Sequence, residues 1–292
     1  MKLFSCELTP NNKIKLVFFG IKLKISVKKN RFDVLKRRLY IIYSKLSAFF
    51  DKNIKTRKYE IVIPLGKDCE LATNYKYFFS AMMDATLYNW SAYIDKRAFI
   101  EGIKHPENIC SGEISFGEEH NTWRCMATTN LFHGNSQPED LMDKNGVIIP
   151  EKRDKEREAV INKIHYLIDK NDKYYHSHEK KLYIFTYNIE NVSEDIEFLK
   201  ELYSYFTLCN DNFDMVVIVE EDKLSKELKD FESDFSNIYI RKVPYFRDKT
   251  PDSISFTYPY FRDWGRVFAE FKYSSARKKT DKKLKSELKS GI

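Results

Sequence analysis

The sequence predicts an α+β or α/β fold in which helices cover the faces of a mixed sheet. Three apolar runs rich in β-branched residues predict buried strands, namely "YEIVIPL", "KKLYIFT" and "FDMVVIV". Longer segments with apolar residues at helical spacing alternate with these runs. The 292 residues are 42% hydrophobic and 15% aromatic with only 9 Gly and 8 Pro, so a large core is expected.

The N-terminal segment is predicted to form a β-hairpin followed by a basic amphipathic helix. Residues 13–27, "KIKLVFFGIKLKISV", alternate lysines with apolar residues, which is typical of strands with one solvated face. The following residues place an apolar set at helical spacing: Phe32, Leu35, Leu39, Ile42, Leu46 and Phe49. We expect this helix either to pack on the body of the protein or to lie on an anionic lipid surface. A nucleic-acid partner is not expected, since no nucleic-acid-binding module is recognisable.

The body begins with a strand, a turn and a helix. Tyr59 to Leu65 form the predicted strand, Gly66 and Lys67 turn the chain, and Asp68 is a suitable N-cap. The helix is expected to run from about Cys69 to Met83. Downstream, helices are predicted over 150–171, 193–208 and 260–271, and strands over 180–190, 213–222 and 236–246.

Charge divides the chain into three predicted regions. Residues 1–58 carry 16 Lys and Arg against 3 acidic residues, and residues 272–292 carry 8 against 2. The intervening body, 59–271, is therefore acidic although the whole chain has a net charge of +7. We expect the basic region 13–58 to favour an anionic membrane surface, and the C-terminal tail to be a solvated, frayed helix.

The cysteine spacing and the absence of certain motifs exclude several classes of binding site. Five widely spaced cysteines without a Cys-x-x-Cys pair fit neither a disulfide framework nor a structural zinc site. With no signal peptide or membrane span recognisable, a cytoplasmic location is expected, peripheral to the inner membrane if the basic arm binds lipid. Nucleotide-binding glycine loops and zinc motifs do not occur, so no cofactor or metal is expected.

Cys69 is the candidate nucleophile. A helix N-terminus lowers the pKa of a thiol, and the loop "LGKDC" offers backbone N–H groups that can stabilise an oxyanion. A thiol nucleophile needs a base, and His133 in "TTNLFHGNSQ" is preferred because it follows an apolar stretch and precedes a turn. His120 ranks second. The other histidines, His105, His165, His176 and His178, are expected in surface loops or within a helix.

Three segments between Ile61 and about Leu182 form a recognisable series: "IPLGKDCELA", "TLYNW" and "NLFHGN". They resemble motifs of the bacterial family of papain-like cysteine peptidases, which has Ser-Leu-Gly-x-Asn-Cys, Pro-Phe-Asp-Trp and an aromatic residue before His-Asp. The resemblance covers about half of the chain. It implies a papain-like core, a nucleophile at Cys69, a base at His133 and a third catalytic residue at Asn89. Substrate contacts would then involve Gly66, Lys67, Asp68 and Trp90.

Three positions depart from the family pattern: Asp68 replaces Asn, Asn89 replaces an acid, and Asn135 follows Gly134 where an acid usually follows the histidine. Asn135 and Asn188 are alternatives for the third catalytic residue.

The segment "KIKLVFFGIKLKI" also resembles leaders of bacterial proteins made alongside capsule and lipopolysaccharide assembly enzymes. That resemblance implies an envelope-glycan setting at the inner membrane face.

Three functions are compatible with these features. The first is a thiol hydrolase or acyl/amide transferase acting on surface-glycan or peptide precursors. The second is a glycosyltransferase-related enzyme, for which "NDNFD" (residues 210–214) is the nearest approach to a metal-binding Asp-x-Asp, although a turn before a strand is the simpler interpretation. The third is a non-catalytic scaffold at the membrane. Acids such as Glu118, Glu119, Glu220, Glu221 and Asp222 are expected to be solvated ends of strands and turns.

Overall fold

A computed structural model describes most of the chain. The residues described are 4–9, 13–18, 21–26, 29–65, 70–79, 86–88, 91–92, 96–110, 114–117, 122–125, 131–134, 136–186, 191–246 and 258–273. The predicted C-terminal tail beyond residue 273 lies outside them.

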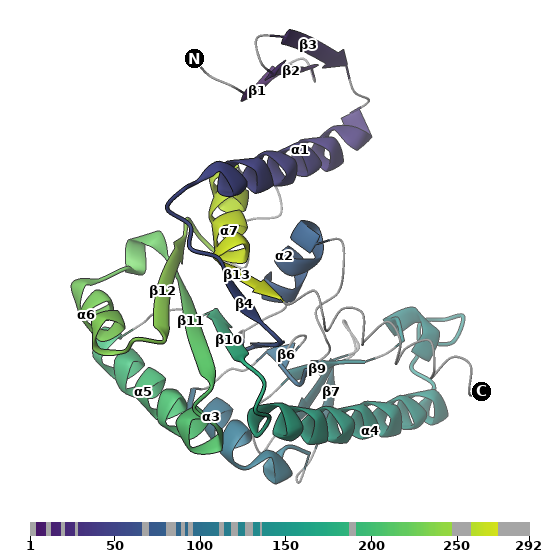
Figure 1. The fold of residues 1–292 in the computed structure, drawn as a ribbon. Coiled ribbons are helices and arrows are strands. Elements are labelled where there is room, and N and C mark those ends of the chain that lie inside the picture. Colours follow the sequence, from purple (N-terminus) through teal and green to yellow (C-terminus); the bar gives the residue numbers. More distant parts are fainter. Residues whose placement is uncertain are drawn as a thin grey trace, which may run out of the picture.

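The centre of the molecule is a four-stranded parallel sheet (Figure 1). Its spatial order is β12-β11-β10-β5, with bounds Ile238–Val243, Phe213–Glu220, Lys181–Thr186 and Ile61–Pro64. Every residue of β5, β10 and β11 is buried, as expected for strands covered on both faces. This burial explains why these strands appear in the sequence as continuous apolar runs rather than alternating ones.

Helices on one face of the sheet connect successive strands. They are α4 (Pro150–Tyr175) before β10, α5 (Val192–Cys209) before β11 and α6 (Lys226–Asp234) before β12. Together with α3 (Lys96–Lys104) they bury one large apolar cluster, in which Tyr183 of β10 stacks on Phe206 of α5 with ring centroids 3.8 Å apart. This repeated strand–helix order is the α/β arrangement that the alternating sequence pattern predicts.

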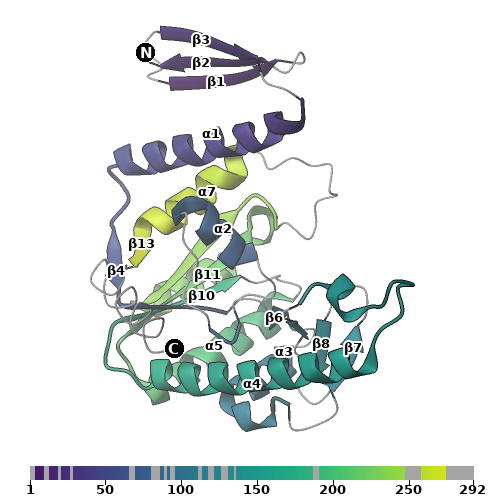
Figure 2. The same cartoon turned by 90° about the vertical axis from the view of Figure 1, so that its right-hand side faces the viewer.

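The opposite face carries two helices from the first third of the chain and one from near the end of the described residues. They are α1 (Lys29–Phe50), α2 (Glu70–Phe79) and α7 (Tyr258–Glu270), which lie above the sheet in Figure 2. A second apolar cluster joins Ile41 of α1, Phe78 of α2 and Trp264 of α7 to the sheet. The molecule therefore has helical layers on both sides of one sheet.

A second sheet is antiparallel and lies beside α3 and α4 in both views (Figures 1 and 2). Its order is β6-β9-β8-β7, with bounds Ser91–Ala92, Leu131–His133, Thr122–Cys125 and Ile114–Gly117. Trp123 and Phe132 anchor it in the first apolar cluster. The prediction of one mixed sheet is therefore wrong for the described residues, because parallel and antiparallel strands form separate sheets.

The N-terminal region contains more than the predicted hairpin. Strands β2 (Lys13–Phe18) and β3 (Ile21–Ser26) form that hairpin, and β1 (Phe4–Thr9) adds a third antiparallel strand. The predicted boundaries after residues 58 and 271 fall inside β4 (Arg57–Tyr59) and β13 (Phe271–Tyr273), which pair with each other in parallel. This pairing ties the end of the basic region to the body.

Helix α1 confirms the predicted amphipathic helix but uses an unexpected face. Ile41, Ser44 and Ala48 are buried. Three residues of the predicted apolar set, Ile42, Leu46 and Phe49, are 53%, 38% and 79% exposed. The helix thus packs on the body through one face and leaves a second apolar face open. Among the described helices, none is long and apolar enough to cross a membrane.

Candidate functional site

The carboxyl ends of the four parallel strands lie at one edge of the central sheet, because all four strands run in the same direction. β10 ends at Thr186, β11 at Glu220 and β12 at Val243, while Leu65 follows β5. Open α/β sheets bind ligands in the crevice outside this edge. Polar and nucleophilic residues at this edge are therefore candidates for a functional site.

Cys69 belongs to the connection that follows β5 at this edge. The connection starts at the carboxyl end of β5 and leads to α2, whose first residue is Glu70. Leu65 donates its backbone N–H to the carbonyl of Ile184 at 2.7 Å, which fixes the start of the connection against β10. The predicted site residues Gly66, Lys67, Asp68 and Cys69 themselves lie outside the described residues.

Two buried polar side chains near this connection have an oxygen atom without a hydrogen-bond partner among the described residues. Asn74 is on α2, one turn after Glu70; its Nδ2 donates to the Tyr260 hydroxyl at 2.6 Å, but its Oδ1 has no partner in the described part of the chain. Thr186 is 4% exposed, and its Oγ1 likewise has no partner within the described ranges. Buried polar atoms without partners are rare, and binding sites are one place where they occur.

A buried carboxylate completes this group. Glu220 is 3% exposed, and its Oε1 accepts the backbone N–H of Phe246 at 2.9 Å. The neighbouring Tyr245 stacks on Tyr260 with ring centroids 5.4 Å apart. We call Asn74, Thr186, Glu220, Tyr245 and Tyr260 the carboxyl-edge cluster. The prediction that Glu220 is solvated is wrong, whereas Glu221 and Asp222 are exposed as predicted.

His133 is the last residue of β9, opposite Thr122 of β8 in the antiparallel sheet. Its neighbour Phe132 packs in the cluster on the α4 face of the parallel sheet, whereas Leu71 of α2 packs in the cluster on the α7 face. The two candidate elements therefore belong to different layers. The structure does not describe the His133 side chain. Several other predicted residues also lie outside the described ranges: Asn89, Trp90, His120, Asn135, Asn188, Glu118 and Glu119.

The remaining histidines occupy surface positions, as expected. His105 is half exposed, and its Nδ1 lies 3.3 Å from a carboxylate oxygen of Glu107. His176 caps α4, and its Nε2 lies 3.5 Å from Asp172. The contacts given for these two side chains in the described part of the chain are to surface carboxylates, so we do not assign either histidine as the base.

The three cysteines whose side chains the structure describes, Cys110, Cys125 and Cys209, are poor nucleophiles. Burial, followed by the neighbouring Cys125 thiol, raises the pKa of Cys110 to about 12. Cys125 is 1% exposed and accepts the backbone N–H of Cys110 at its sulfur, at 3.2 Å. Burial also raises the pKa of Cys209, which is the last residue of α5, where the helix dipole disfavours a thiolate. These environments contrast with a helix N-terminus, where a thiolate is stabilised.

The "NDNFD" segment is a turn at the opposite, amino edge of the sheet. Asn212 donates its backbone N–H to the Asn210 side chain at 2.8 Å, and Asp214 lies within β11. The Asp214 carboxylate accepts the Tyr59 hydroxyl and lies 3.4 Å from the Lys180 ammonium. These contacts favour the turn interpretation over a metal-binding Asp-x-Asp.

Among the residues that the structure describes, no group of three or more His, Cys, Asp or Glu side chains is arranged to hold a metal ion. Comparison of the chain with protein-family models, curated proteins and solved structures finds no match.

Proposed function

We propose that this protein is a thiol enzyme, either a hydrolase or an acyl/amide transferase, with Cys69 as nucleophile and His133 as base. The supporting observation is the position of Glu70, the residue after Cys69, as the first residue of a helix that follows a buried parallel strand. A thiol at such a junction is favoured as a thiolate by the free N–H groups of the first turn.

The proposed reaction needs few groups. The Cys69 thiolate attacks a substrate carbonyl, and the thiol proton passes to His133, which later delivers it to the leaving group. Backbone N–H groups of residues 66–69 are the proposed oxyanion donors, since the Leu65 N–H is already bonded to the Ile184 carbonyl. The unpartnered Asn74 Oδ1 and Thr186 Oγ1 are proposed to hydrogen-bond the substrate. We also propose a papain-like arrangement in which Asn89 orients the His133 imidazole. Trp90 is proposed to contact the substrate, which would be a glycan or peptide precursor.

Alkylation kinetics test this proposal. We expect iodoacetamide to label Cys69 at pH 7 at least tenfold faster than Cys110 or Cys209, because only a thiolate reacts and burial raises the pKa of the latter two. Mass spectrometry of peptides from the full chain measures each rate. Cys69→Ala should remove the fast phase, and the matched control Cys209→Ala should leave it intact.

A second pair of variants tests the base. His133→Asn should slow labelling of Cys69 and shift its pH midpoint upward, since the imidazolium no longer stabilises the thiolate. The control His176→Asn alters an exposed histidine at the end of α4 and should change neither quantity. Equal, slow labelling of Cys69 and Cys209 would overturn the proposal and favour the scaffold alternative.

We also propose that α1 attaches the protein to an anionic bilayer. Phe49 and Phe50 are 79% and 73% exposed and continue the open face formed by Ile42 and Leu46. Residues 1–58 carry a large excess of positive charge, which complements anionic headgroups. Apolar side chains flanked by basic ones are the arrangement that binds membrane interfaces.

Vesicle co-sedimentation tests this attachment. The protein should bind vesicles containing phosphatidylglycerol but not pure phosphatidylcholine, and Phe49→Ser with Phe50→Ser should weaken binding about tenfold or more. Leu208→Ser is the matched control, since Leu208 is an 86% exposed apolar residue on α5. Equal binding by the double variant and the parent protein would contradict attachment through α1.

A further inference from the structure

A cavity of about 520 Å³ lies between α7, β12 and the chain segment that precedes β4. Its size suits a small-molecule ligand. Six cationic side chains line it, together with the carboxylates of Asp263 and Glu270: Lys55, Arg57, Arg241, Lys242, Arg262 and Arg266. This lining is unusual in a body that is acidic as a whole, so the cations are concentrated at one place.

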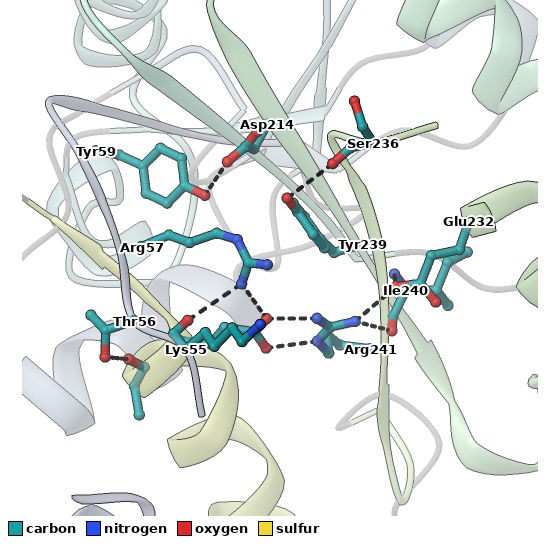
Figure 3. A network of polar contacts seen from close by, with 12 residues as sticks. Lys55, Thr56, Arg57, Tyr59, Asp214, Glu232, Ser236, Tyr239, Ile240 and Arg241 are labelled. Carbon is teal, nitrogen blue, oxygen red and sulfur yellow. Dashed lines mark hydrogen bonds and ion pairs between the residues drawn. The ribbon is translucent and has the colours of Figure 1, made fainter. Parts of the chain in front are cut away.

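Two of the arginines are structural. Arg57 donates to Glu270 at 2.7 Å, and Arg241 donates to both oxygens of the same carboxylate at 2.6 and 2.8 Å (Figure 3). Arg241 also reaches Glu232 at 2.9 Å, and the Arg57 guanidinium lies 4.2 Å from the centre of the Tyr239 ring. Burial alone would lower the pKa of Arg241, but its hydrogen bonds to Glu270 and Glu232 raise it. These contacts hold β4, β12 and the end of α7 together.

The other four cations stand at the solvent-facing side of the cavity. The side chains of Lys242, Arg262 and Arg266 are 47%, 41% and 51% exposed. Lys242 pairs with Glu221 and Arg266 with Asp51, and ion pairs of such exposed cations contribute little stability. Arg262 instead pairs with the buried carboxylate of Asp263. Lys55 is exposed and makes no ion pair within the described part of the chain. A multiply charged anion can therefore recruit these cations without breaking the Glu270 network.

We propose that this cavity binds a ligand through a phosphoryl or diphosphoryl group, with Lys55, Lys242 and Arg266 as its main contacts. Arginine and lysine are the usual partners of phosphate oxygens, and the fixed guanidiniums of Arg57 and Arg241 add a positive field behind them. The ligand is either a free phosphate ester or the phosphorylated headgroup of a lipid. The inference is independent of Cys69 and of the reaction proposed for it.

Calorimetric titration with inorganic pyrophosphate tests the soluble source, and vesicles of phosphatidylcholine containing phosphatidylinositol 4-phosphate test the lipid source. We expect saturable binding to at least one of these probes at low ionic strength, weakened by added salt. The triple variant Lys55→Gln, Lys242→Gln, Arg266→Gln should weaken that binding at least tenfold. These side chains are exposed, and thermal unfolding verifies that the variant folds.

A matched variant controls for net charge. Lys173→Gln, Lys200→Gln, Lys226→Gln removes the same charge from exposed positions on α4, α5 and α6, and should bind as the parent protein does. Binding of pyrophosphate identifies a soluble ligand, and binding of the phosphorylated vesicles alone identifies a headgroup. Absence of binding to both probes, or equal weakening by the two triple variants, would overturn the proposal.

Discussion

At the scale of single residues, Gly265 shows how closely three helices approach one another. It lies in α7, and a Cβ atom placed there would be 3.0 Å from Phe78 of α2 and 3.0 Å from Ser44 of α1. Ser44 is fixed by donating its hydroxyl to the Tyr40 carbonyl at 2.7 Å, and Phe78 is 3% exposed. The absence of a side chain at residue 265 therefore allows α1 and α2 to pack against the same turn of α7.

Gly265→Ala tests this contact. In an exposed helix the change would stabilise by up to about 1 kcal/mol, but overpacking costs about 1–3 kcal/mol, so we expect a net loss in the free energy of unfolding. Urea denaturation measures it. In a double-mutant cycle, Ser44→Gly should recover part of the loss because it removes one of the two crowding atoms. A stabilised Gly265→Ala variant would show that the helices are not in close contact there.

At the scale of elements, the sequence predicts helices and strands best where the apolar pattern depends only on how many faces of the element are buried. β5, β10 and β11 are continuous apolar runs because both faces are covered, and α4 and α5 are long enough for their spacing to be unambiguous. The short elements α3 and α6, with nine residues each, were not predicted. Periodicity over so few residues identifies a helix poorly, and tertiary packing decides whether one forms.

Packing partners were harder to predict than the elements themselves. In α1 the apolar set from Phe32 to Phe49 predicts one buried face, yet Ile41 and Ala48 lie against the body instead. The helix has two apolar faces, and its sequence does not state which of them α7 covers. The sequence prediction for Glu220 is wrong for a related reason: its carboxylate accepts the backbone N–H of Phe246, a contact that depends on where β12 ends. The signal in the sequence for a buried Glu220 is its position directly after the apolar strand run "FDMVVIV".

For the candidate site, the sequence identified the strand–helix junction because both neighbouring elements have clear local patterns. β5 and α2 lie where the residues around Cys69 predict them. The sequence does not single out Asn74 and Thr186, since an Asn within a helix and a Thr at a strand end are ordinary. They become candidates only when burial and the missing partners of their oxygens are known. That information comes from the packing of α2 and α7 against the sheet.

At the scale of the whole molecule, buried tyrosines stabilise both sides of the central sheet. Tyr88, Tyr175 and Tyr183 belong to the cluster under α4 and α5, whereas Tyr59 and Tyr75 belong to the cluster under α7. Burial is the main cause that raises the pKa of each phenol, and it raises the pKa of Tyr75 to about 12. Because ionisation is disfavoured in both clusters, high pH should destabilise the two layers together.

We therefore expect alkaline unfolding in one transition. A raised native pKa means that the stability contributed by these phenols is complete below about pH 10, the ordinary tyrosine pKa, and is lost as the pH rises through the native values. For Tyr75 that window extends from about pH 10 to about 12. The free energy of unfolding in urea should fall steeply above pH 10, and the tyrosinate absorbance of the buried phenols should rise together with the loss of near-ultraviolet circular dichroism. Tyr75→Phe keeps the ring and should make the fall less steep. Complete tyrosine ionisation near pH 10 with unchanged circular dichroism would show that these phenols are not buried in the native state.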